Sequence, residues 1–373
     1  MNLCFLTIGT FSDNATMKRA AGLAPHLAAA GHQVTIVAQD TDENREYFAL
    51  GGDGVEKTFF STSSVVAEIR RKARIVQSRG PDVVYACGWG VRNLPVLLAD
   101  VSVVEHAELP SENHESTAVH RQKSLLLEWL SVGLADGLVL ASQYLHRRYK
   151  HRDLLGRTQQ LYLPYGINYA SADVAQREAE LLNGGSEGAT RRVVYLGSLY
   201  ESYGIFDIVR SVPHVIDEEQ EIEYVILGDG PDREAAIDLA YSLNVQDYID
   251  FEGYVDEDVL GDYLASADVF LAPMFDTVKD KARCPSKIPM YMRYRRPIVT
   301  CRIGEVSSYL GEEGYYYQPG EPRSMAREIV NASRESGLVE YDLGRIRWEH
   351  LARRFLEWVQ NDLDVGKTTL AAS

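Results

Sequence analysis

The chain has 373 residues, a length that suits two domains better than one. It is 45% hydrophobic and 25% charged, which is the composition of an ordinary soluble globular protein. Its formal net charge of −16 argues against a nucleic acid partner, because binding to phosphates requires a basic surface. The cysteines lie far apart without the spacing of a metal site, which favours a reduced, cytoplasmic chain.

The first half alternates predicted strands with helices. The N-terminal stretch MNLCFLTIGTF is too short and uncharged for a signal peptide and predicts a strand over Asn2–Ile8. A helix over about Met17 to Ala30 follows, with Asp13, Asn14 and Thr16 as candidate caps. Further parallel strands are expected at His32–Gln39, Asp82–Cys87, Val101–Glu105, Gly137–Ser142 and Leu161–Asn168.

The second half repeats this pattern after a turn-rich stretch, Tyr169–Thr190, that contains the sequence NGGSEG. Three predicted strands end at glycine or proline, in the segments VVYLG, VILGDGP and ADVFLAP, and a fourth lies within RCPSKIPMYMRYRRPIVTC. Buried strands that stop in this way and pass into helices are typical of a parallel α/β sheet. Such sheets bind ligands at the carboxyl ends of their strands.

The last predicted helix, Ile346–Gln360, places six apolar residues on one face. The pattern therefore predicts an α/β protein with two Rossmann-like parallel-sheet domains facing across a cleft, and a C-terminal helix that packs back. The expected boundaries are 1–168 for the first domain, 169–190 for the linker, 191–345 for the second domain, 346–362 for the helix and 363–373 for the tail.

Seven segments in order resemble the family 4 retaining glycosyltransferases, which have the GT-B fold. In the first half these are AAAGHQVTIVAQ (28–39), VVEHAELPSE (103–112), ADGLVLAS (135–142) and LPYGIN (163–168). The resemblance implies that the second domain binds a nucleoside diphosphate sugar and that the first binds the acceptor. It also implies retention at the anomeric carbon, with no metal ion and no cofactor besides the nucleotide-sugar co-substrate.

The chain departs from this family at several donor-site positions. Ser198 and Tyr203 stand where the family carries an arginine and a lysine that neutralise the diphosphate. Met290 replaces a ribose-binding glutamate and Ala282 replaces an acidic residue that contacts the sugar, while only Gly9 remains of a glycine pair. These losses favour an alternative, a catalytically weak or inactive glycosyltransferase-like subunit that binds glycan or a partner enzyme.

The basic segment Phe275–Lys287 offers replacement cations for the diphosphate. It carries Lys279, Lys281, Arg283 and Lys287, and Ser286 stands where the next helix begins. We expect Arg283 and Lys287 to bind the diphosphate, with Lys18 or Arg19 of the first domain as helpers. The alternative is that these cations are solvated surface charges.

Other candidate residues follow predicted strands. His106 would contact a sugar hydroxyl or assist proton movement, or else cap the sheet, while Glu108 and Glu112 would shape the acceptor pocket or cap a helix. Gly197 would let the diphosphate approach closely, and Asp276 would replace the missing acid. The remaining donor-site candidates are Gly228 and Gly230, which a tight turn explains equally well, and Gly253 and Tyr254, which would line the base pocket.

Two basic clusters, Ile69–Arg74 and Leu145–Arg152, stand out in an acidic chain. They would contact anionic lipid headgroups, or else form solvated helix faces. The sequence thus predicts a cytoplasmic glycosyltransferase, with peripheral contact to the inner face of the membrane as one option. The donor base, the sugar and the acceptor (glycan, lipid-linked or small-molecule) stay open, whereas a nicotinamide enzyme is excluded because GxGxxG follows neither first strand.

Overall fold

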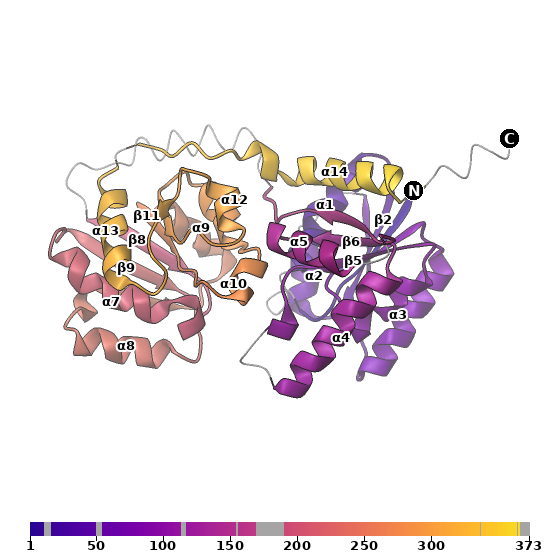
Figure 1. The fold of residues 1–373 in the computed structure, drawn as a ribbon, viewed down its shortest axis with the longest axis horizontal. Helices are drawn as coiled ribbons and strands as arrows, with labels where there is room; N and C mark the ends of the chain where they lie inside the picture. The colour runs from indigo at the N-terminus through magenta and orange to yellow at the C-terminus, as the bar shows by residue number, and fades with distance from the viewer. Residues whose placement is uncertain are drawn as a thin grey trace. The chain divides into compact units, whose positions relative to one another are not determined.

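The computed structural model describes residues 1–10, 16–49, 54–112, 117–153, 156–168, 190–335, 337–363 and 365, without the side chains of residues 257 and 258. These residues form two units, each built on one parallel sheet (Figure 1). Unit 1 contains residues up to 168, residues 282–284 and the chain from residue 344 onward. Unit 2 contains residues 190–281 and 285–343. The candidate caps Asp13 and Asn14, nearly all of the predicted linker and most of the predicted tail lie outside the described residues.

The sheet of unit 1 has seven parallel strands in the order β3-β2-β1-β4-β5-β6-β7. They are β1 (Asn2–Leu6), β2 (Gln33–Gln39), β3 (Val55–Phe60), β4 (Val83–Ala86), β5 (Val101–His106), β6 (Gly137–Leu140) and β7 (Gln159–Tyr162). The predicted strands of this unit are confirmed except for Leu161–Asn168, of which only Leu161 and Tyr162 belong to a strand. β3 was not predicted. β7 ends at Tyr162, and Pro164, which follows, has no backbone N–H to donate to a ladder.

The helices of unit 1 are α1 (Met17–Ala29), α2 (Asp42–Ala49), α3 (Val65–Arg79), α4 (Ala118–Leu134), α5 (Gln143–Arg152) and α14 (Trp348–Asn361), with short 3-10 turns η1 (Val91–Leu98), η2 (Pro110–Glu112) and η5 (Gly344–Ile346). Hydroxyl side chains cap three of them. Ser64, Thr117 and Ser142 each accept a backbone N–H three residues on, at 3.2 Å, which fixes where α3, α4 and α5 begin.

The C-terminal helix α14 packs on α1 within unit 1, as predicted (Figure 1). Its six predicted apolar residues are buried: Trp348, Leu351, Ala352, Phe355, Trp358 and Val359. A Cβ atom on Gly22 of α1 would lie 2.2 Å from the Trp348 ring, so the glycine makes room for the indole. The last helix is therefore part of the core of unit 1.

The sheet of unit 2 has six parallel strands in the order β10-β9-β8-β11-β12-β13. They are β8 (Arg191–Leu196), β9 (Ile222–Leu227), β10 (Ile249–Gly253), β11 (Val269–Ala272), β12 (Ile298–Thr300) and β13 (Tyr315–Tyr316). Its helices are α7 (Ile205–Ile216), α8 (Arg233–Ser242), α9 (Glu257–Ala265), α10 (Val278–Ala282), α11 (Lys287–Met292), α12 (Val306–Leu310) and α13 (Pro322–Ser333), with turns η3 (Glu201–Tyr203) and η4 (Gln246–Tyr248).

Each sheet reverses its strand order once, between β1 and β4 in unit 1 and between β8 and β11 in unit 2. Doubly wound sheets bind ligands outside the carboxyl ends of the strands at this reversal. A ligand is therefore expected at the residues that follow β1 and β4 in unit 1, and at those that follow β8 and β11 in unit 2. In the described part of the chain, no helix has both the length and the apolar character needed to cross a membrane.

Candidate functional site

Gly197 and Lys287 lie side by side at the carboxyl end of β8. Gly197 follows the strand with φ +153°, and a Cβ atom there would lie 2.6 Å from Lys287 Nζ. The ammonium group also lies 4.3 Å from the centroid of the Tyr195 ring, which holds it over the strand end. The structure thus brings together two residues that the sequence predicts to meet a diphosphate.

Three strand-end loops of unit 2 stack tightly by their backbones. Gly228 N donates to Gly253 O at 2.7 Å, and a Cβ atom on Gly228 would lie 2.1 Å from Gly197 O. A Cβ atom on Gly230 would lie 2.4 Å from Leu199 O. Gly228 and Gly230 therefore serve close contact with the protein's own backbone, which agrees with the turn alternative.

Lysine side chains lie close to both positions where the family's donor-site cations are missing. Ser198 is exposed and directly follows Gly197, beside Lys287. Lys279 Nζ lies 5.2 Å from the centroid of the Tyr203 ring. The loop after β8 has no cation at these two positions. The segment after β11 thus supplies lysine side chains next to them.

Short helix α11, which begins after Ser286, is attached to the same strand end. Leu196 N donates to Tyr291 OH at 2.8 Å, and the Tyr291 ring stacks on Phe270 of β11 with centroids 4.2 Å apart. This fixes the origin of the Lys287 side chain, while Met290 on the same helix is half-buried.

The remaining donor-side candidates lie on exposed loops. Tyr254 follows β10 and is 79% exposed, so its ring is open to a ligand. Asp276 is exposed and forms an ion pair with Lys281. Ala282, which stands where the family carries an acidic residue, is fully buried, so this position does not contact a donor sugar.

Arg283 lies in the segment 282–284, which belongs to unit 1. Ser142 Oγ donates to Ala282 O at 2.6 Å, and Tyr165 N donates to Cys284 Sγ at 3.5 Å. The two predicted diphosphate ligands, Arg283 and Lys287, thus belong to different units although only three residues separate them.

His106 ends β5, is buried, and uses both ring nitrogens inside unit 1. Ser131 Oγ donates to Glu128 O at 2.7 Å, so it accepts from His106 Nε2–H, at 2.8 Å. Nδ1 then accepts from Tyr149 OH at 3.0 Å. Burial, with the charge of Arg152 as a second cause, lowers the pKa of His106 to about 3, so the ring is neutral at pH 7.

Arg19 and Lys18 differ sharply in their surroundings. The Arg19 side chain is fully buried; Nε donates to Glu105 Oε1 at 2.8 Å and NH1 donates to Pro164 O at 3.1 Å. The Tyr85 and Tyr165 hydroxyls also donate to the Glu105 carboxylate. This geometry gives Arg19 a structural role. The half-buried Lys18 stays a predicted ligand of the diphosphate.

The loop after β5 holds the predicted acceptor-side carboxylates. Glu108 is exposed. Glu112 accepts from Arg148 of α5 at 2.7 Å, which ties the 3-10 turn η2 to that helix. The Glu112 carboxylate is thus engaged in an ion pair that holds η2 on α5, whereas the exposed Glu108 carboxylate can contact a ligand.

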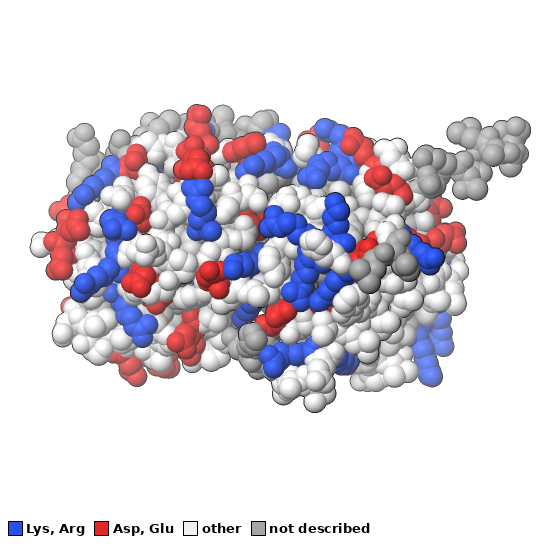
Figure 2. Space-filling view, in the orientation of Figure 1, with Lys and Arg blue, Asp and Glu red and all other residues white. Residues whose placement is uncertain are grey.

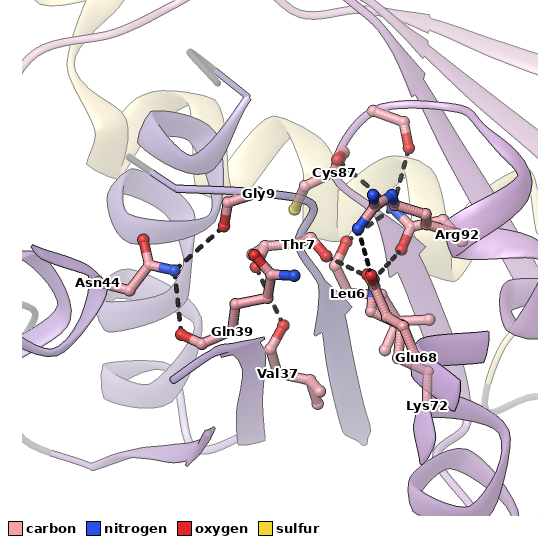
Figure 3. A network of polar contacts seen from close by, with 12 residues as sticks. Leu6, Thr7, Gly9, Val37, Gln39, Asn44, Glu68, Lys72, Cys87 and Arg92 are labelled. Carbon is pink, nitrogen blue, oxygen red and sulfur yellow. Dashed lines mark hydrogen bonds and ion pairs between the residues drawn. The ribbon is translucent and has the colours of Figure 1, made fainter. Parts of the chain in front are cut away.

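A buried polar network holds the backbone from Thr7 to Gly9, just after β1 (Figure 3). Lys72 Nζ donates to Thr7 O at 2.6 Å, to Glu68 Oε1 at 2.7 Å and to Asn93 Oδ1 at 2.9 Å. Asn44 Nδ2 donates to Gly9 O at 3.1 Å. The backbone around Gly9 is therefore held from two sides, and sequence reasoning missed this network because Lys72 stands within a run of basic residues.

Within the described residues, no group of three or more His, Cys, Asp or Glu side chains is placed to hold a metal ion. Metal independence stays a prediction.

Comparisons with known proteins agree with this architecture. Residues 190–335 match the family model described as group 1 glycosyl transferases. An uncharacterized glycosyltransferase from Methanocaldococcus jannaschii is 22% identical over 368 residues, which span 89% of this chain and 90% of that protein.

Two solved structures show the same fold over the full length of both chains. Sucrose-phosphate synthase from Thermosynechococcus elongatus superposes with a TM-score of 0.65 at 16% identity. Anabaena HepE, in its complex with UDP, superposes with a TM-score of 0.65 at 14% identity. The chain therefore has the GT-B fold, and its second half carries a group 1 glycosyltransferase domain, which confirms the predicted class of enzyme.

Proposed function

We propose that the protein transfers a sugar from a nucleoside diphosphate sugar, held at the carboxyl edge of the unit 2 sheet, to an acceptor bound by unit 1. The observation that carries this proposal is the position of Lys287. Its ammonium group lies against Gly197, so a phosphate group at this strand end would meet a cation and a backbone that carries no side chain.

Charge stabilisation is the chemical task of this site. When the bond between the sugar and the diphosphate breaks, negative charge grows on the leaving phosphate, and preorganised cations lower the barrier. Lys287 and Lys279 of unit 2 are the cations that would stabilise the leaving phosphate, and we propose Arg283 as a third. Lys287 is fixed by the Tyr195 ring and by the attachment of α11 to β8, so little reorganisation is needed.

The resemblance to retaining enzymes supports a reaction with retention and without a metal ion. In such a reaction the leaving phosphate takes the acceptor proton, and no separate catalytic base is required. Because both ring nitrogens of the buried His106 are bonded within unit 1, its role in this scheme is to position the loop after β5, and Glu108 and the backbone at Gly9 are the groups that would contact the acceptor. The low pKa of His106 makes it unsuited to acting as a cation at neutral pH.

Uridine is the first donor base to test, because structures of Anabaena HepE are titled as complexes with UDP and with UDP-glucose. The acceptor is a glycan, a lipid-linked sugar or a small molecule.

The proposal is tested by titrating UDP, GDP, ADP and TDP into the wild-type protein and two variants. Lys287→Ala should weaken binding of the preferred nucleotide at least about tenfold, since one charge-assisted contact to phosphate is lost. The matched control is Arg327→Ala, which removes an exposed cation of α13 paired with Glu328. Equal affinity of wild-type protein and Lys287→Ala would remove Lys287 from the site.

A further inference from the structure

Helix α4 turns three polar residues inward and most of its large apolar residues outward. Ser124, Glu128 and Ser131 are buried. With about 3.6 residues per turn, these positions share one face of the helix. A surface helix of a globular protein normally shows the opposite arrangement.

Two of the inward polar residues of α4, Glu128 and Ser131, are bonded to other parts of unit 1. Glu128 accepts from Ser111 N at 3.2 Å and from Arg152 NH1 at 2.9 Å, and Ser131 is bonded to His106. These bonds fix which way the helix faces. The outward apolar face is therefore a built feature of the fold and does not arise from a loosely attached helix.

The outward face carries large apolar side chains along its whole length. Val119, Leu126, Leu130 and Leu134 recur at helical spacing and are 77%, 60%, 40% and 51% exposed. Trp129 and Leu125 flank this row and are also exposed. We call these six residues the α4 apolar face.

Basic side chains surround the α4 apolar face. His120 and Lys123 are exposed on α4, and Arg121 is partly exposed. Arg147, Lys150 and His151 are exposed on α5, the helix that packs on α4 through Arg152. The single acidic residue of α4, Glu128, is buried and ion-paired. In Figure 2 an uncharged area extends around α4, with Lys and Arg side chains along its border.

We propose that the α4 apolar face docks unit 1 onto an anionic lipid bilayer. Apolar side chains enter the boundary between headgroups and acyl chains, Trp129 takes an interfacial position, and the basic border contacts the headgroups. This combination supports a membrane surface rather than a second copy of the chain. A two-fold symmetric contact through α4 would bring the same basic border against itself, which like-charge repulsion disfavours.

The docking extends the proposed function, although it does not depend on it. The inner face of α4 is bonded to His106, so the helix would hold the acceptor-binding loops of unit 1 close to the bilayer. If the proposed function holds, a position close to the bilayer favours a lipid or a lipid-linked sugar as the acceptor.

The test is flotation of the full chain with vesicles of phosphatidylcholine, with or without about 30% phosphatidylglycerol. Wild-type protein should float with the anionic vesicles, and rising salt should weaken the binding. Leu126→Glu combined with Leu130→Glu should reduce binding at least about tenfold. The matched control, Tyr241→Glu combined with Leu243→Glu, places the same two charges at exposed apolar residues at the end of α8 in unit 2 and should bind as wild type does.

Circular dichroism and nucleotide titration establish that each variant is folded. Three outcomes overturn the proposal. In the first, wild-type protein does not float with the anionic vesicles. In the second, the double variant floats as well as wild type does. In the third, wild-type protein forms a concentration-dependent dimer that the double substitution dissociates, and neither protein binds vesicles. Loss of nucleotide binding in all variants and in the wild type would instead contradict the proposed function and leave the docking result intact.

Discussion

Two lysines show how burial decides what a cation does in this protein. Lys287, which is half-buried, places its ammonium group at a strand end beside Gly197. Lys72 is fully enclosed and gives its three N–H groups to Thr7 O, Glu68 and Asn93. Burial lowers the pKa of Lys72, and the Glu68 carboxylate opposes that shift. The first lysine lies where we propose that the diphosphate binds, and the second holds the backbone just after β1.

Replacing Lys72 should therefore damage the fold, whereas replacing its neighbour should not. Lys72→Met leaves Glu68 buried with only Arg92 as a cationic partner at 2.6 Å. Breaking a buried pair in this way costs about 3 kcal/mol in the free energy of unfolding. Arg71→Met, at the exposed next residue of α3, should stay within about 0.5 kcal/mol of wild type.

Urea unfolding followed by tryptophan fluorescence measures this difference, because Trp89, Trp129, Trp348 and Trp358 all lie in unit 1. Equal losses in the two variants would mean that the Lys72 network does not stabilise the unit.

Single residues were predictable from the sequence where a local pattern determines their position. Gly197 ends a buried strand and Lys287 opens the helix after a proline-containing loop, and the structure brings them together. Arg19 was not predictable, because its partner Glu105 is 86 residues away along the chain. Lys72 and Arg71 look alike in the sequence, and only the packing of α3 separates them.

At the level of elements, the buried apolar runs predicted most strands to within a few residues. Strands of a parallel sheet are apolar on both faces, so their ends coincide with the first glycine, proline or polar residue. Helix α4 was not singled out, because Leu125, Leu126 and Trp129 read as core residues in a sequence. Their exposure follows from the hydrogen bonds of Ser131 and Glu128, which no local pattern specifies.

His106 joins three elements, β5, α4 and α5, and this joint should weaken in acid. Its pKa is about 3 in the folded protein and about 6.5 in the unfolded chain, so the unfolded chain binds the proton first as pH falls. The stability that the neutral ring contributes is present above pH 6.5 and is lost progressively toward pH 3.

We expect wild-type protein to lose about 1.4 kcal/mol more than His106→Gln between about pH 7.5 and 5.5, with glutamine as the non-titrating reference. Urea unfolding at the two pH values gives this number. A difference between the two proteins that does not change with pH would show that His106 titrates normally in the folded state.

For the molecule as a whole, the order of strands and helices predicted the fold class. Two Rossmann-like sheets and a final helix that returns to the first unit follow from the alternation of elements and from the apolar face of α14. The net charge of −16 did not reveal where charge is concentrated. Basic side chains gather around α4 and at the donor edge, since surface position depends on packing and not on composition.

In the proposed function, this chain is an active transferase despite its altered donor motif. The most direct test is turnover of nucleoside diphosphate sugars by the purified protein, with a membrane lipid extract as the acceptor source. We predict release of nucleoside diphosphate from donors of one base, with Lys287→Ala reducing the rate at least about tenfold and Arg327→Ala leaving it unchanged. Nucleotide binding without release from any donor would contradict this account and identify a binding subunit instead.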